Sequence, residues 1–486
     1  MRRVYLSLAS LVLLALACNL GGGPARSPFP SPVTTPTSSP TVAPEPSPSP
    51  SLSPAPSPEP GLDKWDLWVD GPHLRGANIY QRRVYPELDG PDFMGPDPVG
   101  PPYTQEDFDR LAALGANYVN ISHPGLFTET PPYTLDQEIQ DNLDNLLDMI
   151  AKADMFAVIS FRTGPGRAEF SVCCLGDDWF DESYLDDSVW QDQAAQGAWV
   201  AMWRYTAERY RDNPIVVGYD LMVEPNSNEV GSDALNPLDI WDPEEFYSTY
   251  GGTLYDWNQL YPRITAVIRQ VDAETPILIG GMGYSAVEWL PYLQPMGDPR
   301  AVYTVHQYEP FVYTHQEPPL INTYPGVFDT DWDGDDDQFN RAWLEDLLST
   351  VDTFAATHGV PVAVNEYGLM RWQPGAADFM DDQMDLFEQR GMNYALWEWQ
   401  TSWEPFAEEV HAFNFRLGPD PDNRADVASS DLIEVIAQYW RRNKVRPSNF
   451  TQEPSTRVGW VLEAPSAWVL LCTQVGRRRL VDMLAG

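Results

Sequence analysis

The feature that most constrains this chain is a repeated alternation of short β-type runs with amphipathic helical segments. Eight β-type runs occur at residues 74–80, 116–122, 156–161, 215–223, 276–281, 301–308, 361–367 and 392–399. Helical patterns follow them at residues 105–115, 137–153, 193–214, 253–271, 285–293, 339–359, 378–391 and 429–444. Eight units of this kind predict a closed (β/α)8 TIM barrel of the α/β class.

The barrel units fall in one stretch, which we assign as a single domain at residues 61–446. Its length is ordinary for this fold, since such barrels run from about 200 to over 400 residues. Residues 447–486 contain the basic run at 477–479 and fit no part of the scheme. They stay unassigned.

Residues 1–18 have the pattern of a lipoprotein-type signal peptide, with two arginines, an apolar run from Val4 to Ala17, and then Cys18. The run is too short to span a bilayer, which needs about 20 apolar residues. The ending LALAC is similar to a bacterial lipobox, so we expect lipidation at Cys18. A plain secretory signal, with Cys18 near the cleavage point by chance, is the alternative.

Residues 19–60 are rich in proline, serine and threonine and nearly free of apolar side chains, which predicts a disordered linker. In the polyproline II form, at about 3.1 Å per residue, it reaches on the order of 100 Å. A glycosylated stalk is equally compatible. We therefore expect an extracellular domain tethered to the cell surface as a lipoprotein.

The composition of the chain limits the classes of molecule that it could bind. The formal net charge of −41 argues against nucleic acid and anionic lipid, because both are polyanions. The 18 tryptophans and 23 tyrosines suit carbohydrate stacking, and equally a large core. Cys173, Cys174 and Cys472 show no zinc spacing, and the adjacent pair is either two free thiols or a vicinal disulfide. We expect a monomer without a cofactor.

Two apolar strands end in a glutamate. Glu224 follows the run at 215–223, and Glu366 lies in the run at 361–367. In a TIM barrel the carboxyl ends of all strands face one mouth, so we expect the two carboxyls to converge there. Such a pair suits retaining cleavage of a glycosidic bond, in which one carboxyl is the nucleophile and the other the acid and then the base. A structural ion pair for each glutamate is the weaker alternative.

The chain from about Leu74 to Gln400 resembles glycoside hydrolase family five, the cellulase and mannanase family of retaining barrels. The resemblance rests on RGANIY (75–80), RYRDNPIVVGYDLMVEPN (209–226), VHQYEPFVYTHQ (305–316), PVAVNEYG (361–368) and ALWEWQ (395–400). It implies a hydrolase of β-linked polysaccharides or oligosaccharides, without fixing glucan against mannan.

The resemblance also implies roles for individual residues. Glu224 is then the acid/base and Glu366 the nucleophile. His306 and Tyr308 hold the two carboxylates, Trp397 stacks beneath the reacting sugar, and Asn78 and Arg75 support the site from the first strand.

Three positions depart from the family pattern. Asn120 stands where the family has an arginine, Arg162 where it has a histidine, and Val223 where it has the asparagine that binds the sugar 2-hydroxyl. In one interpretation the site is rewired: Arg162 replaces the missing arginine, and the lost polar contact comes from Asn120, His123 or Asn226. In the other, the barrel is catalytically inactive and only binds carbohydrate. The joint presence of both glutamates with His306, Tyr308 and Trp397 favours the first.

The segment DTDWDGDDDQFN resembles the opening of a calcium loop, with Asp329, Asp331 and Asp333 before Gly334. The twelfth position is Asn340, whereas such loops use a bidentate glutamate there. We therefore expect a solvated acidic loop, with calcium as a weak alternative and no other metal site.

Overall fold

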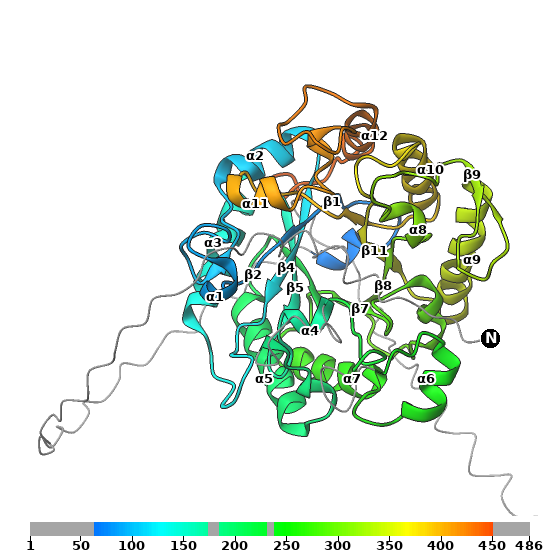
Figure 1. Cartoon of the computed structure of the whole chain (residues 1–486). Helices are drawn as coiled ribbons and strands as arrows, with labels where there is room; N and C mark the ends of the chain where they lie inside the picture. Colours follow the sequence, from blue (N-terminus) through cyan, green and yellow to red (C-terminus); the bar gives the residue numbers. More distant parts are fainter. Residues whose placement is uncertain (1–62, 174–183, 231–237, 451–486) are drawn as a thin grey trace, which may run out of the picture. The chain divides into compact units, whose positions relative to one another are not determined.

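Eight parallel strands close into a barrel, which confirms the predicted fold class. The computed structural model describes residues 63–173, 184–230 and 238–450, and Figure 1 shows its strands in the centre with helices around them. The strands pair in the ring order β1-β12-β11-β8-β7-β6-β5-β4. Their bounds are β1 Arg75–Tyr80, β4 Tyr118–Pro124, β5 Phe156–Thr163, β6 Val216–Asp220, β7 Ile277–Gly280, β8 Ala301–Gln307, β11 Val362–Tyr367 and β12 Tyr394–Leu396.

The outer layer consists of the predicted crossover helices. They are α2 Gln105–Leu114, α3 Gln137–Lys152, α5 Gln193–Tyr210, α7 Trp257–Arg269, α9 Arg341–His358, α10 Ala376–Gln389 and α12 Asp431–Trp440. The segment predicted as a helix at 285–293 is instead the short 3₁₀ helix η6 (Val287–Tyr292), which contains Pro291. Proline has no N–H to donate and its ring disfavours a regular α-helical turn, so a short element is the expected result.

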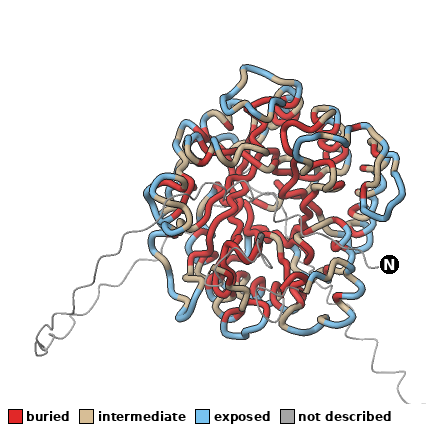
Figure 2. The backbone as a smooth tube through the Cα atoms, in the orientation of Figure 1, coloured by how far each residue is buried: buried red, intermediate tan, exposed pale blue. Residues whose placement is uncertain are grey.

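Polar residues start these helices. Thr104 and Asp107 form a reciprocal capping box at α2, and the side chain of Ser430 accepts from Ile433 N at α12. Such caps satisfy backbone N–H groups that the first turn leaves without a partner. Figure 2 shows the resulting arrangement, with buried backbone in the barrel and exposed backbone around its outer rim.

The loops that follow strands carry additional short elements, which enlarge the mouth of the barrel. They are β2 Arg82–Arg83, α1 Pro86–Asp89, β3 Val99–Gly100, α4 Phe170–Cys173, η5 Ser188–Trp190, α6 Pro243–Tyr250, α8 Phe311–Thr314, β9 Gly326–Phe328, β10 Asp337–Phe339, α11 Glu404–Glu409 and η7 Phe415–Leu417. Each lies between a barrel strand and the next crossover helix. This is the side of the fold on which TIM-barrel active sites are built.

The opposite end of the barrel is closed by η3 (Lys64–Leu67) and Trp68. The indole of Trp68 donates to Val217 O at 2.8 Å, and the Lys64 ammonium donates to Asn213 O at 3.0 Å. An apolar cluster fills the barrel above this plug; it comprises Leu67, Trp68, Leu74, Tyr118, Phe156, Val158, Val217, Leu278, Val302, Ala363 and Ala395. The barrel is thus packed at its amino end, and access is from the other end.

The described part of the chain extends slightly past the predicted domain boundary at 446. Phe450 packs edge-on against Phe156, with ring centroids 5.7 Å apart. The segments predicted as signal peptide and linker, with Cys18, lie outside the described residues, as do Cys174, Cys472 and residues 451–486. Within the described residues, every helix is too short or too polar to cross a bilayer.

Candidate active site

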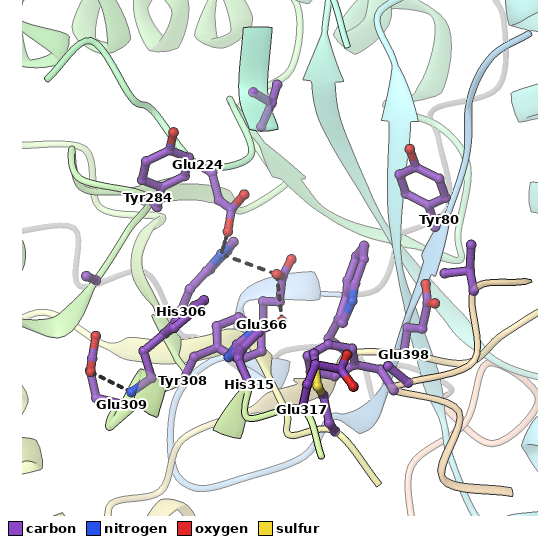
Figure 3. A pocket seen from close by; sticks show the side chains of 18 of the residues that line it. Tyr80, Glu224, Tyr284, His306, Tyr308, Glu309, His315, Glu317, Glu366 and Glu398 are labelled. Atoms are coloured by element: carbon purple, nitrogen blue, oxygen red, sulfur yellow. Dashed lines mark hydrogen bonds and ion pairs between the residues drawn. The ribbon is translucent and has the colours of Figure 1, made fainter. Parts of the chain in front are cut away.

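A cavity of about 1370 Å³ opens at the carboxyl ends of the strands. Six predicted site residues line it: Glu224, His306, Tyr308, Glu366, Trp397 and Arg162. Figure 3 shows the first four together, with His306 lying between the two glutamates. The structure therefore brings together side chains that are far apart in the sequence.

The two glutamates converge through His306. Its Nδ1 lies 3.1 Å from Oε1 of Glu224 and 3.7 Å from Oε1 of Glu366. One oxygen of Glu224 lies within 4.8 Å of one oxygen of Glu366. This spacing resembles the separation of about 5 to 5.5 Å in retaining glycosidases and is shorter than the separation of about 6.5 to 9.5 Å in inverting ones.

A β-bulge in β11 sets the direction of Glu366. Along the β8–β11 ladder Val364 pairs with Val305, but Glu366 pairs with His306, so Asn365 is an extra residue on one strand. A bulge of this kind turns the following side chain relative to regular alternation. The Tyr308 hydroxyl donates to Oε1 of Glu366 at 2.8 Å and fixes the carboxylate from the other side.

Burial alone would raise the pKa of both carboxyls, but their charged neighbours shift the two pKa values in opposite directions. At Glu224 the hydrogen bond and charge of His306 outweigh burial and hold the pKa below its usual range. At Glu366, burial and the charge of Glu224 outweigh the effect of His306 and raise the pKa to about 7. Two acids this close titrate as one pair, so below about pH 7 they share a single proton.

His306 is a cation in this arrangement. Burial lowers its pKa, but the negative charges of Glu366 and Glu224 raise it to about 9. A protonated imidazole between two carboxylates reduces their mutual repulsion and keeps them close.

A layer of buried polar side chains lies beneath the two glutamates. Asn78 donates to Asn365 O and Ala395 O, each at 3.0 Å, and Asn120 donates to Oδ1 of Asn78 at 2.8 Å. Asn365 in turn donates to Asp220 at 2.7 Å. Asn78 and Asn120 therefore support the floor of the site, and neither lines the cavity.

Arg162 lines the cavity beside this layer. Its Nε donates to the buried carboxylate of Glu169 at 3.0 Å, and the Tyr80 hydroxyl donates to the same oxygen at 2.8 Å. Its two Nη groups have no hydrogen-bond acceptor among the described residues, although the residue is only 8% exposed. The positive charge of Arg162 lowers the pKa of both Glu224 and Glu366.

Other predicted site residues lie elsewhere. Arg75 points away from the mouth and forms an ion pair with Glu388 of α10, with its Nη2 2.8 Å from the carboxylate. His123 is buried and lies 3.0 Å from Asn142 of α3. The structure brings neither into the cavity.

The structure shows where Val223 lies, the residue that stands in place of the family asparagine. The Val223 side chain is buried and does not line the cavity. Asn226 is also buried, where its amide donates to Ser171 O at 3.0 Å. Of the side chains expected to supply the lost polar contact, Asn120, His123 and Asn226 are thus all engaged outside the cavity.

Two residues of the site, Glu398 and Tyr284, were not predicted from the sequence. Glu398 follows Trp397 and lines the cavity; burial and the charge of Glu366 raise its pKa to about 8. Tyr284 also lines the cavity, and Trp241 stacks on it with ring centroids 5.9 Å apart. Tyr284 lies in a loop without a periodicity or spacing that would select it, and Glu398 lies inside the strand predicted at 392–399, where nothing distinguished it from its neighbours.

A long loop forms one wall of the cavity, and Arg371 organises it. The Arg371 guanidinium, 1% exposed, donates to the carbonyl oxygens of His411, Gly418, Asp420, Pro421 and Asn423. His411, Ala412, Phe413, Pro421, Asp422 and Arg424 of this loop line the cavity.

The acidic loop brings Asp329, Asp331 and Asp333 together, with one oxygen of each within 4.8 Å of the others. Their carboxylates accept hydrogen bonds from the loop's own backbone, for example from Gly334 N to Asp329 at 2.9 Å. Asn340, the twelfth position, caps α9 by accepting from Ala342 N. The geometry is that of an acidic turn followed by a helix cap.

Comparison with known proteins points to one family. The family model for cellulase, glycosyl hydrolase family 5, matches residues 87–402. Endoglucanase C of Acetivibrio thermocellus is 22% identical over 219 residues, which cover 44% of this chain and 52% of that protein. Cellodextrinase A of Ruminococcus flavefaciens is 22% identical over 55% of this chain and 68% of that protein. The match to endoglucanase C thus spans about half of its length.

Solved structures agree on the fold. Endoglucanase Cel5A of Thermotoga maritima superposes with a TM-score of 0.52 and 19% identity, covering 77% of this chain and 100% of that chain. The same protein has been solved in complex with cellobiose and with mannotriose, with TM-scores of 0.51 and 0.50. At this identity the likeness shows a shared barrel fold.

Proposed function

Because the chain belongs to the cellulase family, glycosyl hydrolase family 5, we propose that it is a retaining glycoside hydrolase of β-linked polysaccharides or oligosaccharides. The observation that carries this proposal is the pair of carboxyls, with one oxygen of Glu224 within 4.8 Å of one oxygen of Glu366. In this proposal Glu224 is the acid/base and Glu366 the nucleophile.

The reaction takes two displacements. In the first, a carboxylate oxygen of Glu366 bonds to the anomeric carbon as the glycosidic C–O bond breaks, and Glu224 gives its proton to the leaving oxygen. In the second, Glu224 takes a proton from water, the water oxygen bonds to the anomeric carbon, and the bond to Glu366 breaks. The anomeric configuration is retained, and the proton returns to Glu224.

The first step needs the shared proton on Glu224, whereas the resting structure favours Glu366. Substrate binding supports the transfer, because the Glu224 side chain is 15% exposed and that of Glu366 only 6%. A bound sugar therefore removes more water from Glu224 and raises its pKa from this low starting value. Nδ1 of His306 lies between the two oxygens and provides a path for the proton.

Arg162 is the side chain best suited to bind the sugar beside the nucleophile. Its free Nη groups border the cavity, while Glu169 and Tyr80 fix its other end. Hydrogen bonds to a sugar hydroxyl that strengthen in the transition state contribute several kcal/mol together with ring distortion. This supports the rewired site over a decayed one. Trp397, intermediate in exposure, offers its ring to the sugar from the cavity wall.

The names of two relatives, endoglucanase C and cellodextrinase A, support a proposal for the substrate class. The Thermotoga protein has been crystallised with cellobiose and mannotriose, so we propose a β-glucan or a β-mannan as substrate. We also propose that the enzyme acts outside the cell, anchored through Cys18 and extended on the linker at 19–60. Radiolabelled lipid incorporation, lost in Cys18→Ala, tests the anchor.

Reducing-sugar release by the purified chain from β-glucans, mannans, xylans and xyloglucan tests the function, with Glu366→Gln as control. Release from one polymer that disappears in the variant supports the proposal and identifies the substrate. Nuclear magnetic resonance of the first product then reports whether the anomer is retained. If no reducing sugar is released from any polymer while glycan binding is intact, the result would support a catalytically inactive carbohydrate-binding barrel instead.

A further inference from the structure

Arg167 is a buried cation next to the proposed acid/base. It follows β5 in a tight turn, where its N–H donates to Gly164 O at 2.9 Å and Gly164 N donates back to Arg167 O at 3.0 Å. The side chain is 1% exposed. Among the described residues no carboxylate forms an ion pair with it. Burying an arginine without an ion pair is costly, so its contacts need an explanation.

Among the described residues, the hydrogen bonds of this guanidinium go to the end of β5 and to the loop after β6, at the barrel mouth. Nη1 donates to Arg162 O and to Val223 O, each at 2.7 Å. Nη2 donates to Glu224 O at 2.6 Å and to Oδ1 of Asn226 at 3.1 Å. One rigid fork therefore connects the loop after β5 to three positions of the loop that carries Glu224.

The backbone of Glu224 is in an uncommon conformation. Its φ is +53°, in the left-handed region that non-glycine residues seldom adopt. Neighbouring contacts hold both sides of it: Val223 N donates to Phe161 O at 2.9 Å, and Tyr284 N donates to Pro225 O at 3.1 Å. Such a conformation persists where the surroundings over-determine it, and Arg167 binds the carbonyls of Val223 and Glu224 themselves.

We propose that Arg167 is the positioning residue of Glu224, which holds the backbone of the acid/base in its left-handed conformation and supplies a fixed positive charge next to this residue. This inference rests on the proposed function. It also explains how Glu224 is held when position 223 is a valine whose side chain is buried away from the cavity.

The charge of Arg167 acts on the proton of the catalytic pair. Burial lowers the pKa of Arg167 itself to about 10, so it stays cationic at neutral pH. Its charge is one of the influences that lower the pKa of Glu224. The other titratable or charged groups that face Glu224 are His306 of β8, Glu366 of β11, Arg162 of β5, and Tyr284 and Tyr308.

The test compares Arg167→Lys and Arg167→Met in the full chain. Both variants lose the fork, so kcat should fall by about 10- to 100-fold while KM changes little, because misplacing a catalytic group by about 1 Å has an effect of this size. Only Arg167→Met loses the charge. The pKa of Glu224 then rises, so the alkaline limb of kcat/KM should move up by about 1 pH unit. In Arg167→Lys the limb should stay near its wild-type position.

Arg371→Met is the matched control. Arg371 is also a buried arginine that binds only backbone carbonyls and a histidine ring among the described residues, but the charges that influence it are those of Arg424 and Asp420. Its loss should leave the alkaline limb in place. If kcat falls in Arg167→Met but the alkaline limb of kcat/KM does not move, Arg167 has only a structural role. Wild-type kinetics in both Arg167 variants would overturn the proposal.

A second measurement does not depend on turnover. Carbon-13 resonances of labelled glutamates, titrated in Glu366→Gln with and without Arg167→Lys or Arg167→Met, report the pKa of Glu224 directly. A rise in the methionine variant alone supports the proposal, and equal values in all three chains contradict it. If the wild-type chain hydrolyses none of the polymers, the proposed function fails, while this titration still decides whether Arg167 acts on Glu224. Should the methionine variant not fold, the kcat and KM of the lysine variant decide the positioning role.

Discussion

Glu366 lies directly across the β8–β11 ladder from His306, and it does so because Asn365 is an extra residue in β11. Regular alternation places residues 363 and 365 on one face of the strand and 366 on the other. The bulge changes this, so that Asn365 serves the buried floor while Glu366 contacts His306 and Tyr308. The site thus depends on a local irregularity of the barrel.

The two glutamates should respond differently to the leaving group. In Glu224→Gln, hydrolysis of a natural glycoside should fall by about 10² to 10⁴, because that leaving oxygen needs a proton. An aryl glycoside with an acidic phenol needs none, so its first step should stay near the wild-type rate. Pre-steady-state bursts of phenol measure that step. Glu366→Gln should be inactive on both substrates, and equal sensitivity of the two variants to the leaving group would contradict the assigned roles.

Activity should decline above about pH 7. The active form holds one proton on the pair, and it is lost with a pKa of about 7. The Tyr308 hydrogen bond lowers the pKa of Glu366, so Tyr308→Phe should raise the pair's pKa and move the alkaline limb upward. The pH profile of kcat/KM measures both effects. A limb that moves downward in the variant would show that Tyr308 acts otherwise.

Replacing Arg162 should lower kcat more than it raises KM, because a contact that strengthens in the transition state is lost. We expect a decrease of about 100-fold in Arg162→Met, comparable to the loss of one electrostatic donor in an enzyme site. Arg162→Lys keeps the charge without the fork and should be intermediate. Steady-state kinetics on the identified polymer measure kcat and KM separately. An increase in KM without a decrease in kcat would mean that Arg162 contributes only to binding of the ground state.

Restoring the family asparagine with Val223→Asn should not restore a sugar contact. The Val223 side chain is buried away from the cavity, so an amide there loses its water without reaching substrate. We expect a loss of about 1 to 3 kcal/mol in the free energy of unfolding and no gain in kcat. Urea denaturation measures the first, with Val223→Ile as a size control. A rise in kcat would mean that the loop can rotate the side chain into the site.

The stability of Asp220→Asn relative to wild type should increase as pH rises. Burial raises the pKa of Asp220 to about 6, against the opposing effects of His306 and its hydrogen bonds. A carboxyl whose pKa is raised on folding loses stability as pH rises through that value. The free energy of unfolding of the variant, relative to wild type, should therefore increase between pH 4 and pH 8 by at most about 3 kcal/mol. A relative stability that is constant with pH would contradict this.

The sequence was sufficient to predict those site residues whose positions depend only on the order of the strands. Glu224 and Glu366 follow or end apolar runs, and the rule that strand ends converge holds whatever the register. The alternation of side chains along a strand explains why Arg75 and His123 lie outside the site. Arg75 is three residues from Asn78 and His123 three from Asn120, so each pair must face opposite sides of its strand. With both asparagines in the floor, Arg75 and His123 face the helices.

Other features had no counterpart in the sequence pattern. A bulge adds one residue without altering composition, and it leaves a run such as VAVNEY looking like a regular strand. Arg167 acts through hydrogen bonds to carbonyl groups, which every residue possesses, so its partners carry no signature. Strand β12 also ends at Leu396, so Trp397 leaves the ladder earlier than its apolar surroundings indicate.

The cavity wall held by Arg371 has a consequence for engineering. Five carbonyl oxygens between His411 and Asn423 converge on that one guanidinium, which itself belongs to the loop after β11. The shape of this loop is thus encoded outside the loop. A designer who transplants residues 411–424 onto another barrel to change its substrate range must carry the arginine with them, because the exchangeable unit is a loop and its distant anchor.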